Sequence, residues 1–402
     1  MFHEATIRDA FPIFAQPKSK ELVYLDNAAT TQRPLVVVDA IRDFYLQDNA
    51  NVHRANHRLA RSAEGCLATV RSQVQAFLNA SSSKEVVFTR GTTESLNLVA
   101  QAYGEHEVEE GDEVIVSIME HHSNLLPWQR LCQKKKAHLQ IAPMTSTGHI
   151  DVEKLSILLT KRTKVVAINY VSNVLGTIQP IKEIVRLAHK QGAVVVVDAA
   201  QSVPHLPIDV QALDCDFLAF SAHKMYGPTG IGVLYGKERH LAAMAPYQVG
   251  GGMVRSLPDN GYPGYEEPPY RFEAGTQHLA GLAGLGAALH FLEEVGYTLL
   301  QAHEKKLATT LYQALDDLPN VRLINPSVPD IAIAIFNVQG VHSLDVGMRL
   351  DAQNIAVRTG LFCAKPLMDA LGEGQGAVRI SCGMYNTVEE IEKVVTVLRS
   401  IS

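Results

Sequence analysis

Residues 192–227 read GAVVVVDAAQSVPHLPIDVQALDCDFLAFSAHKMYG. Four valines, 194–197, lead to Asp198, and a second apolar run at 217–220 leads to the sequence SAHK, which ends at Lys224. Apolar runs of this length, bounded by polar residues, predict strands that are buried on both faces of a parallel sheet. Because α/β proteins bind ligands at the carboxyl edge of such a sheet, Asp198 and Lys224 are expected to lie at one ligand crevice.

Strand and helix patterns alternate outward from this stretch and predict a mainly parallel central sheet with crossover helices. Beyond it, helical and strand patterns predict a smaller α+β C-terminal domain, so we expect a large domain at 21–285 and a small one formed by 1–20 and 286–402. Residues 253–272 are rich in Pro, Gly and Tyr without any period, which is typical of a functional loop or lid. The expected strands are 22–26, 85–89, 113–118, 165–170, 194–198, 217–221, 231–235, 331–337 and one near 379; the expected helices are 34–47, 59–79, 92–103, 124–136, 181–191, 279–295, 343–353 and one from 388.

The composition is that of an ordinary globular protein. The chain has 402 residues, 47% of them hydrophobic, and a formal net charge of −6, which weighs against a nucleic-acid-binding protein. Its five cysteines are scattered without a CxxC pair, so no zinc or dithiol site is indicated and a reducing compartment is favoured. The first residues do not read as a secretory signal, and no apolar run is long enough for a membrane helix. We therefore expect a cytoplasmic protein.

The pair of Asp198 and Lys224 suggests a cofactor. Pyridoxal phosphate (PLP) chemistry requires a lysine that holds the cofactor covalently and a carboxylate for its pyridinium nitrogen. Taken alone, the pair fits equally well a structural aspartate that caps a turn and a solvated lysine.

Polar sequences follow three other predicted strands. TRGTTES at 89–95 places hydroxyls and a glycine turn at a helix start, where free N–H groups attract a phosphate; Thr92 is also the natural start of a simple capping box. EHHSN at 120–124 supplies His121, an imidazole that can stack on an aromatic ring or move protons, unless the two histidines are merely one buried and one solvated. Asn173 either donates to a cofactor hydroxyl or shapes the following turn at Gly176.

The loop VRTGLFCAKP at 357–366 carries the most promising nucleophile. Cys363 lies there beside Arg358 and Lys365, and nearby cations favour the thiolate, which is the reactive form. The alternative is a packed cysteine without chemistry. Arg379 offers a planar fork that can hold a substrate carboxylate in a bidentate pair.

With these motifs together, the chain resembles the PLP-dependent cysteine desulfurases of the class V aminotransferase superfamily, in particular the SufS/CsdA-type subgroup. The resemblance runs nearly end to end and rests on the motifs LDNAATTQRP, NVHR, TRGTTESLNLVA, EHHSNLLPW, VSNVLG, VVDAAQ, DFLAFSAHKMYGPTGIG, RFEAGT, VRTGLFCAKPL and MYNT. It implies the PLP-dependent transferase fold type I, with a large PLP-binding domain and a smaller domain that carries the cysteine loop.

The resemblance also implies a role for each candidate residue. Lys224 would hold PLP covalently, with Asp198 on the pyridinium nitrogen, Gln201 on the ring hydroxyl and His121 stacked on the ring. The phosphate would be held by Thr92, Thr93, Ser221 and His223, with Thr276 reaching in from a second subunit of a homodimer. Asn173, Arg379 and Arg358 would bind the substrate, and Cys363 would accept its sulfur.

The implied reaction converts L-cysteine to L-alanine and leaves a persulfide on Cys363 for iron–sulfur cluster assembly or a related pathway. Selenocysteine and cysteine sulfinate are further candidate substrates, and the short loop after Arg358 implies a SufE-like protein as the sulfur acceptor. The chain departs from the subgroup at Phe362, where a histidine is usual, and SAHK replaces the commoner SGHK. The alternatives are a PLP-dependent aminotransferase or lyase that acts on another amino acid, and a non-catalytic sulfur-relay protein with the same fold.

Overall fold

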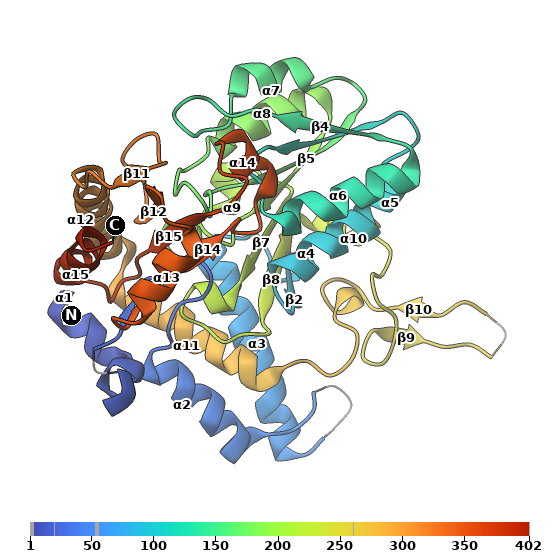
Figure 1. Ribbon diagram of the computed structural model, residues 1–402. Coiled ribbons are helices and arrows are strands. Elements are labelled where there is room, and N and C mark those ends of the chain that lie inside the picture. The colour runs from blue at the N-terminus through green and yellow to red at the C-terminus, as the bar shows by residue number, and fades with distance from the viewer. Residues whose placement is uncertain (1–3, 20, 53–55, 260, 402) are drawn as a thin grey trace.

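The structure is a computed structural model that describes residues 4–19, 21–52, 56–259 and 261–401 (Figure 1). Its centre is a seven-stranded sheet in the order β2-β8-β7-β6-β5-β3-β4. The strands β3 to β7 pair in parallel, whereas β8 runs antiparallel to both of its neighbours. This architecture confirms the predicted α/β fold with a mainly parallel sheet. The strands are β2 (Val86–Thr89), β3 (Glu113–Ser117), β4 (His138–Ala142), β5 (Thr163–Asn169), β6 (Val194–Asp198), β7 (Phe217–Ser221) and β8 (Gly232–Gly236).

The valine run in β6 shows why both faces of this sheet are covered. Val195 and Val197 belong to the core on the side of α3, α8 and α11, whereas Val194 and Val196 belong to the core on the side of α4 and α6. Since neighbouring side chains on a strand point to opposite faces, a continuous apolar run satisfies both cores. The helices of this part are α2 (Leu35–Asp43), α3 (Arg58–Leu78), α4 (Thr92–Leu98), α5 (Glu105–Glu107), α6 (His122–Lys135), α7 (Val152–Leu158), α8 (Ile181–Gln191), α9 (Val210–Leu213), α10 (Glu238–Ala243) and α11 (Leu279–Val295).

A second, antiparallel sheet of four strands has the order β11-β12-β15-β14. It forms its own core with α12, α13 and α15, as the orange and red part of Figure 1 shows. Between β14 and β15 the short helix α14 follows the cysteine loop. The elements are β11 (Val321–Leu323), β12 (Ile333–Val338), β13 (Ile355–Ala356), β14 (Arg358–Gly360), β15 (Ala377–Ser381), α12 (Tyr297–Asp316), α13 (Ser343–Asp351), α14 (Lys365–Ala370) and α15 (Val388–Arg399).

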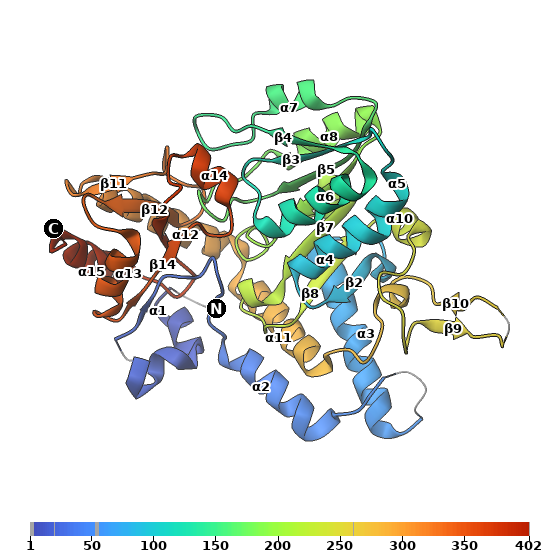
Figure 2. The same cartoon turned by 45° about the vertical axis from the view of Figure 1, so that its right-hand side comes forward.

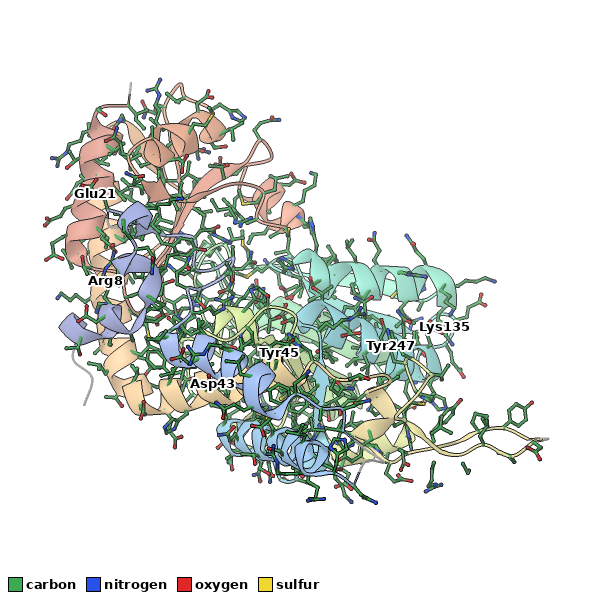
Figure 3. All side chains as sticks on the ribbon, turned by 90° about the horizontal axis from the view of Figure 1, so that it is seen from below. Arg8, Glu21, Asp43, Tyr45, Lys135 and Tyr247 are labelled. Carbon is green, nitrogen blue, oxygen red and sulfur yellow. The ribbon has the colours of Figure 1, made fainter. Side chains whose placement is uncertain are left out.

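The N-terminal segment joins this second sheet although it lies hundreds of residues away in the chain. Strand β1 (Val23–Tyr24) pairs in parallel with β13, and the backbone N–H of Leu25 donates to the carbonyl oxygen of Ala356 across 2.9 Å. Before it, α1 (Glu4–Ile7) leads to a turn in which Arg8 forms an ion pair with Glu390 of α15 at 2.8 Å. Figure 3, which labels Arg8, shows the N-terminal helices against this C-terminal part of the chain.

Residues 253–272 differ from the expected structureless loop. They contain a short antiparallel hairpin of β9 (Val254–Ser256) and β10 (Gly264–Tyr265), which extends away from the rest of the chain in Figure 2. The expected helix 34–47 also changes its hydrogen-bond pattern, because α2 ends at Asp43 and continues as a π turn, η4 (Phe44–Asp48). A similar π turn, η6 (Val99–Gly104), follows α4. Other short helical turns are η1 (Arg8–Ala10), η2 (Pro12–Ala15), η3 (Pro17–Ser19), η5 (Ser83–Glu85), η7 (Ala222–Lys224) and η8 (Tyr270–Phe272).

None of the helices in the described ranges is both long enough and apolar enough to cross a membrane.

Candidate active site

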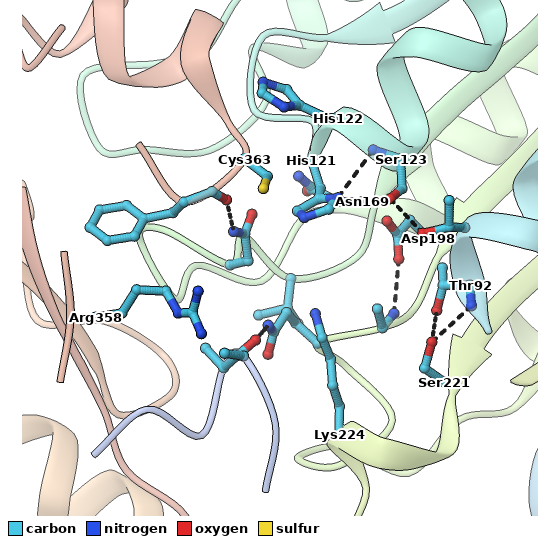
Figure 4. A pocket seen from close by; sticks show the side chains of 18 of the residues that line it. Thr92, His121, His122, Ser123, Asn169, Asp198, Ser221, Lys224, Arg358 and Cys363 are labelled. Carbon is cyan, nitrogen blue, oxygen red and sulfur yellow. Dashed lines mark hydrogen bonds between the residues drawn. The ribbon is translucent and has the colours of Figure 1, made fainter. Parts of the chain in front are cut away.

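A cavity of about 650 Å³ opens where the carboxyl ends of β5, β6 and β7 face the cysteine loop (Figure 4). The side chains from the large sheet and those from the cysteine loop therefore meet in one space, as the sequence predicted. The predicted residues that line it are Thr92, Thr93, His121, Asn173, Asp198, Gln201, Ser221, His223, Lys224, Arg358, Cys363 and Arg379.

Asp198 and Lys224 reach the cavity from adjacent strands. Asp198 is the last residue of β6, and Lys224 ends the single turn η7 that follows β7. Oδ1 of Asp198 accepts a hydrogen bond from the backbone N–H of Ala200 at 2.9 Å. Burial raises the pKa of Asp198, and burial lowers the pKa of Lys224 to about 8 in spite of the carboxylate nearby. The neutral, nucleophilic amine is therefore a much larger fraction of Lys224 near neutral pH than of an ordinary lysine.

His121 is fixed at the start of α6, where it is the N-cap. Its Nδ1 accepts a hydrogen bond from the backbone N–H of Ser123 at 3.1 Å, so the ring proton of the neutral form lies on Nε2. Burial and then the charge of Lys224 lower the pKa of His121 to about 3. The ring is therefore a neutral, flat surface on one wall of the cavity.

Glu120 supports this wall from behind. It accepts hydrogen bonds from Ser117, from Nδ2 of Asn124 at 2.7 Å and from the backbone N–H of Asn169 at 3.0 Å. Burial raises the pKa of Glu120 to about 8. This network connects the end of β3 to the end of β5 and to the first turn of α6, and so it orients the segment that carries His121.

The polar end of the cavity lies at the start of α4. Ser221 Oγ accepts from the backbone N–H of Thr92 at 2.8 Å and lies 2.7 Å from the hydroxyl of Thr92. The hydroxyl of Thr93 lies 2.7 Å from that of Ser123. The capping box considered for Thr92 is not formed, since the N-cap is Gly91, which has no side chain. Hydroxyls and helix N–H groups thus converge where a phosphate would bind.

Close backbone packing keeps this turn in place. A Cβ atom at Gly232 of β8 would lie 2.3 Å from Cα of Gly91, which is too close for any residue with a side chain. Gly232, the second glycine of the GIG sequence, is therefore required because β8 approaches the turn before α4 so closely. His223, on the same side, contacts the hydroxyl of Thr30 through Nδ1 at 3.3 Å, and burial lowers its pKa to about 4.

The two predicted amide ligands bond to backbone. Nε2 of Gln201 donates to the carbonyl oxygen of Ala28 at 2.6 Å, and Nδ2 of Asn173 donates to that of Phe362 at 2.9 Å. The hydrogen bond of Asn173 connects the cysteine loop to the loop that follows β5. Asn173 therefore does more than shape the turn at Gly176.

The cysteine loop itself has an unusual backbone. Phe362 and Cys363 both have φ of 54°, in the left-handed region that side chains disfavour. Phe362 is buried, whereas Cys363 is exposed, which none of the other four cysteines is. This strained backbone conformation buries the side chain of Phe362 and directs the thiol of Cys363 toward the cavity.

The two arginines lie on the side of the cysteine loop. Arg379 donates from Nη1 to the carbonyl oxygen of Asn173 at 2.9 Å and from Nη2 to Oδ1 of Asp26 at 3.3 Å. Its guanidinium carbon is 5.0 Å from the ring centre of Phe362. Burial lowers the pKa of Arg379 to about 10, so the group is still charged at neutral pH. Arg358 also pairs with Asp26, at 2.9 Å.

Thr276 stands apart from the other predicted residues. It is exposed and lines a different cavity, together with Arg90, Tyr247 and Gln248. The segment NVHR falls partly outside the described residues, since the structure does not describe residues 53–55.

Sequence reasoning missed several residues of this site. Asp26, Glu120, His122, Ser123 and Asn169 all contact or line it. His122 and Ser123 stood beside a predicted residue and Asn169 ended a predicted strand, so position alone could have nominated them. Within the described ranges there is no group of three or more histidine, cysteine or acidic side chains placed to hold a metal ion.

Known proteins share this fold and sequence. The family model described as aminotransferase class-V matches residues 23–394. The chain is 46% identical over 396 residues to a cysteine desulfurase of Dickeya dadantii, in an alignment that covers 98% of this chain and 96% of the relative. It superposes on the crystal structure of the cysteine desulfurase CsdA from Escherichia coli with a TM-score of 0.92 and 39% identity, covering 99% of this chain and 98% of that one. For the apo structure of the cysteine desulfurase from Thermococcus onnurineus NA1, the TM-score is 0.93 and the identity 39%, over 100% of this chain and 98% of that one.

These similarities extend over nearly the whole chain, so they cover both sheets and the cavity between them. The family is PLP-dependent. Both the sequence relatives and the solved neighbours agree with the resemblance that the motifs indicated. The chain belongs to the class-V aminotransferase family, in which its relatives are the cysteine desulfurases.

Proposed function

We propose that this protein is a PLP-dependent cysteine desulfurase that converts L-cysteine to L-alanine and moves the sulfur onto Cys363. The observation that carries the proposal is that one cavity contains both a lysine of lowered pKa, Lys224, and an exposed cysteine. An aminotransferase reaction would need only the lysine, whereas the transfer of sulfur also needs a thiol in the same cavity.

The residues of the cavity fit PLP by their donor chemistry. Asp198 lines the cavity, and its Oδ2 makes no hydrogen bond to any described residue, so one carboxylate oxygen is available for a pyridinium N–H. The flat ring of His121 offers a stacking surface, and Ser221, Thr92 and Thr93 offer hydroxyls to a phosphate. When bound, PLP supplies the electron sink that makes the α-proton of an amino acid acidic.

Lys224 is the proton carrier in this account. Its pKa of about 8 lets the neutral amine take up the α-proton of the substrate at neutral pH, and the protonated amine can return a proton to carbon afterwards. Asp198 stays close enough to stabilise positive charge on this side of the cavity. Because His121 has a pKa of about 3, we assign it to stacking and orientation.

The sulfur transfer balances without an external oxidant. The thiolate of Cys363 attacks the sulfur of the substrate, an S–S bond forms and the C–S bond of the substrate breaks. The electron pair of the C–S bond stays with the carbon atom, which takes a proton from Lys224 and becomes the methyl group of alanine. The α-carbon then takes a second proton, which balances the one that the Cys363 thiol lost when it formed the thiolate. The exposed loop position of Cys363 suits a nucleophile that must approach the substrate and then be reached by an acceptor.

Arg379 and Asn173 are proposed to hold the substrate carboxylate. Nε of Arg379 is buried and has no hydrogen-bond partner among the described residues, which leaves donor capacity unused at the cavity. A bidentate arginine–carboxylate pair fixes both the position and the orientation of the substrate. Arg358 lines the same cavity near the cysteine loop.

Two assembly proposals accompany this function. The exposed Thr276 is proposed to complete the phosphate site of a second copy in a homodimer, since it is absent from the cavity of its own chain. A SufE-like protein is proposed to collect the sulfur from Cys363 for iron–sulfur cluster assembly or a related pathway. Selenocysteine and cysteine sulfinate are proposed as further substrates.

The test is product analysis of the purified protein loaded with PLP. The account predicts that L-cysteine gives alanine and, in the presence of a reductant, sulfide in equal amounts. Lys224→Ala should abolish both products, whereas Lys161→Ala, which removes an exposed lysine that does not line the cavity, should leave both unchanged. Protein that binds PLP but forms neither product would instead indicate an aminotransferase or lyase of the same family that acts on another amino acid.

A further inference from the structure

Glu120 is a second buried acid close to the one proposed to face the cofactor. It is only 1% exposed and immediately precedes His121 in the chain. Its Oε1 accepts a hydrogen bond from the backbone N–H of Asn169 at 3.0 Å. Asn169 in turn is the partner of Asp198 in the parallel pairing of β5 with β6, and both line the cavity (Figure 4). A single strand end therefore separates Glu120 from Asp198.

The hydrogen bonds around Glu120 all point toward its carboxyl group. The indole N–H of Trp128 can only donate, and it donates to Oδ1 of Asn124 at 3.1 Å. The amide nitrogen of Asn124 therefore faces Oε2 of Glu120, to which it donates at 2.7 Å. The hydroxyl of Ser117 and the backbone N–H of Asn169 donate to Oε1. These donors hold the carboxyl group in place in both of its protonation states, because a carboxylic acid still accepts hydrogen bonds.

Charge decides which of the two states Glu120 adopts. Its hydrogen-bond partners in the described ranges are all neutral, so none of them balances a negative charge. Burial and the like charge of Asp198 raise the pKa of Glu120 to about 8. Near neutral pH, Glu120 therefore carries a proton while Asp198 is a carboxylate. The titratable and charged groups that line the cavity on the elements around this wall are His121, His122, Asp198, Lys224, Cys363 and Arg379.

A cation placed on Asp198 changes this balance. The protonated ring nitrogen of PLP is the cation that the site is proposed to accept. Once the charge of Asp198 is balanced, the like-charge effect on Glu120 disappears, and the three hydrogen-bond donors around Glu120 still favour its ionised form. The pKa of Glu120 must then be lower with the ring bound than without it.

We propose that Glu120 is the proton partner of Asp198: it holds a proton while the carboxylate of Asp198 is free, and it releases this proton to the solvent when a cationic ring nitrogen pairs with Asp198. Cofactor binding and the ionisation of Glu120 are thus coupled. Glu120 is a positioning residue, since it acts through Asp198 and not on the ring itself. The inference rests on the proposed function for the identity of the cofactor, but its test does not need turnover.

The test counts the protons that the full chain exchanges with the buffer when it binds a PLP analogue. Deoxypyridoxine phosphate keeps the ring nitrogen and the phosphate but lacks the aldehyde, so it cannot react with Lys224. Its binding heat is measured on PLP-free protein in buffers of different ionisation enthalpy, which gives the number of protons released. At about pH 7.5, the unchanged protein should release about half a proton more per analogue bound than Glu120→Gln, and this difference should vanish by about pH 9.5.

The pH dependence of the affinity gives a second readout. Because the pKa of Glu120 is lower in the complex than in the free protein, binding is favoured as the pH rises toward 8 and no longer depends on Glu120 above it. Below pH 8, the affinity of the unchanged protein should therefore rise about threefold per pH unit more steeply than that of E120Q. A loss of structure alone would lower the affinity without changing this slope.

Two controls separate the proton of Glu120 from its place in the network. Glu113→Gln removes a buried acid from the other end of β3, and Trp128→Phe removes the indole donor but keeps Glu120. Both variants should release as many protons as the unchanged protein. If E120Q does not fold, E120Q combined with W128F is compared with W128F, because Asn124 can then turn its carbonyl oxygen toward the new amide.

Equal proton release by the unchanged protein and E120Q would overturn the inference, and so would failure of the analogue to bind. An analogue in which a C–H group replaces the ring nitrogen should release no extra proton. The same release with this analogue would show that Asp198 is not the link and would also overturn the inference. Absence of alanine formation from L-cysteine, with proton release as expected, would contradict the proposed function alone.

Discussion

The backbone N–H of His122 donates to the carbonyl oxygen of Cys363 across 2.7 Å, so the first residue of α6 holds the cysteine loop. The side chain of His122 adds a second bond, because its Nε2 accepts from the backbone N–H of Lys365 at 3.3 Å. His121, the neighbouring residue, faces the cavity at the same point. The wall proposed to stack on the cofactor and the loop that carries the nucleophile are therefore coupled by two consecutive histidines.

Replacing His122 with alanine should loosen the cysteine loop. The variant loses the side-chain hydrogen bond to Lys365 and keeps the backbone bond to Cys363, so the expected cost is about 1 kcal/mol, or about a fivefold shift toward open loop conformations. The alkylation rate of Cys363 by iodoacetamide should rise accordingly, while PLP binding stays the same. His106→Ala, which changes an exposed histidine, should not alter the rate, and an equal rate in all three proteins would contradict the coupling.

The lowered pKa of Lys224 predicts the pH dependence of PLP capture. Burial brings the pKa to about 8, and only the neutral amine is nucleophilic. In PLP-free protein, the rate of covalent capture should therefore increase with pH up to about 8 and level off above it. Colour development over time measures this rate. A rate that keeps rising toward pH 10.5, the ordinary value for lysine, would show that burial does not lower the pKa; Lys365→Ala should give the same profile as the unchanged chain.

Phe362 should contribute to substrate affinity through Arg379. The guanidinium group lies 5.0 Å from the ring centre, a distance at which a partly desolvated cation–π contact is worth about 1 kcal/mol. Phe362→Leu keeps the apolar bulk and removes the ring, so KM for L-cysteine should rise about fivefold while kcat changes little. Phe77→Leu, at an aromatic residue outside the cavity, should leave KM unchanged. A fall in kcat alone would show that Phe362 acts on Cys363 instead.

A buried ion pair should stabilise the segment that carries Thr276. Glu273 accepts from Arg71 at 2.7 and 2.8 Å and from the backbone N–H of Phe88 at 2.8 Å. Glu273→Gln leaves a buried arginine without its counter-ion, and the free energy of unfolding in urea should fall by about 3 kcal/mol. Glu267→Gln removes a carboxylate whose side chain is 66% exposed and should cost less than about 1 kcal/mol. Similar losses in the two variants would contradict the structural role of the buried pair.

The elements that sequence predicted well are those with strong local signals. The limits of β7, α8 and α11 agree with the expected ranges, because a continuous apolar run or a helical period followed by a glycine marks them. Edge strand β4 was missed because its polar–apolar alternation, HLQIA, is only five residues long and just one of these residues, Ala142, is buried. Helix α12 was missed because His303 and Glu304 lie on its buried face and interrupt the apolar stripe.

The site residues also divide into those that local sequence signals predict and those that only the folded chain brings together. Asp198, Lys224 and His121 end or follow predicted strands, so sheet geometry alone placed them together. Asp26 could not be found by this reasoning, since its partners Arg358 and Arg379 lie 332 and 353 residues away in the chain. The pairing of β1 with β13 and the bridge between Asp26 and Ser381 bring them together. The roles of the site residues and the division into two domains at 285 stay predictions.

The transfer of sulfur to Cys363 is the central claim, and peptide mass spectrometry after one turnover tests it most directly. Protein loaded with PLP is mixed with one equivalent of L-cysteine, and alanine is quantified in the same sample. The account predicts that the peptide containing Cys363 becomes heavier by one sulfur atom, in proportion to the alanine formed, and that Cys66→Ala behaves identically. Unmodified Cys363 with full alanine formation, or undiminished alanine and sulfide from Cys363→Ala, would contradict it.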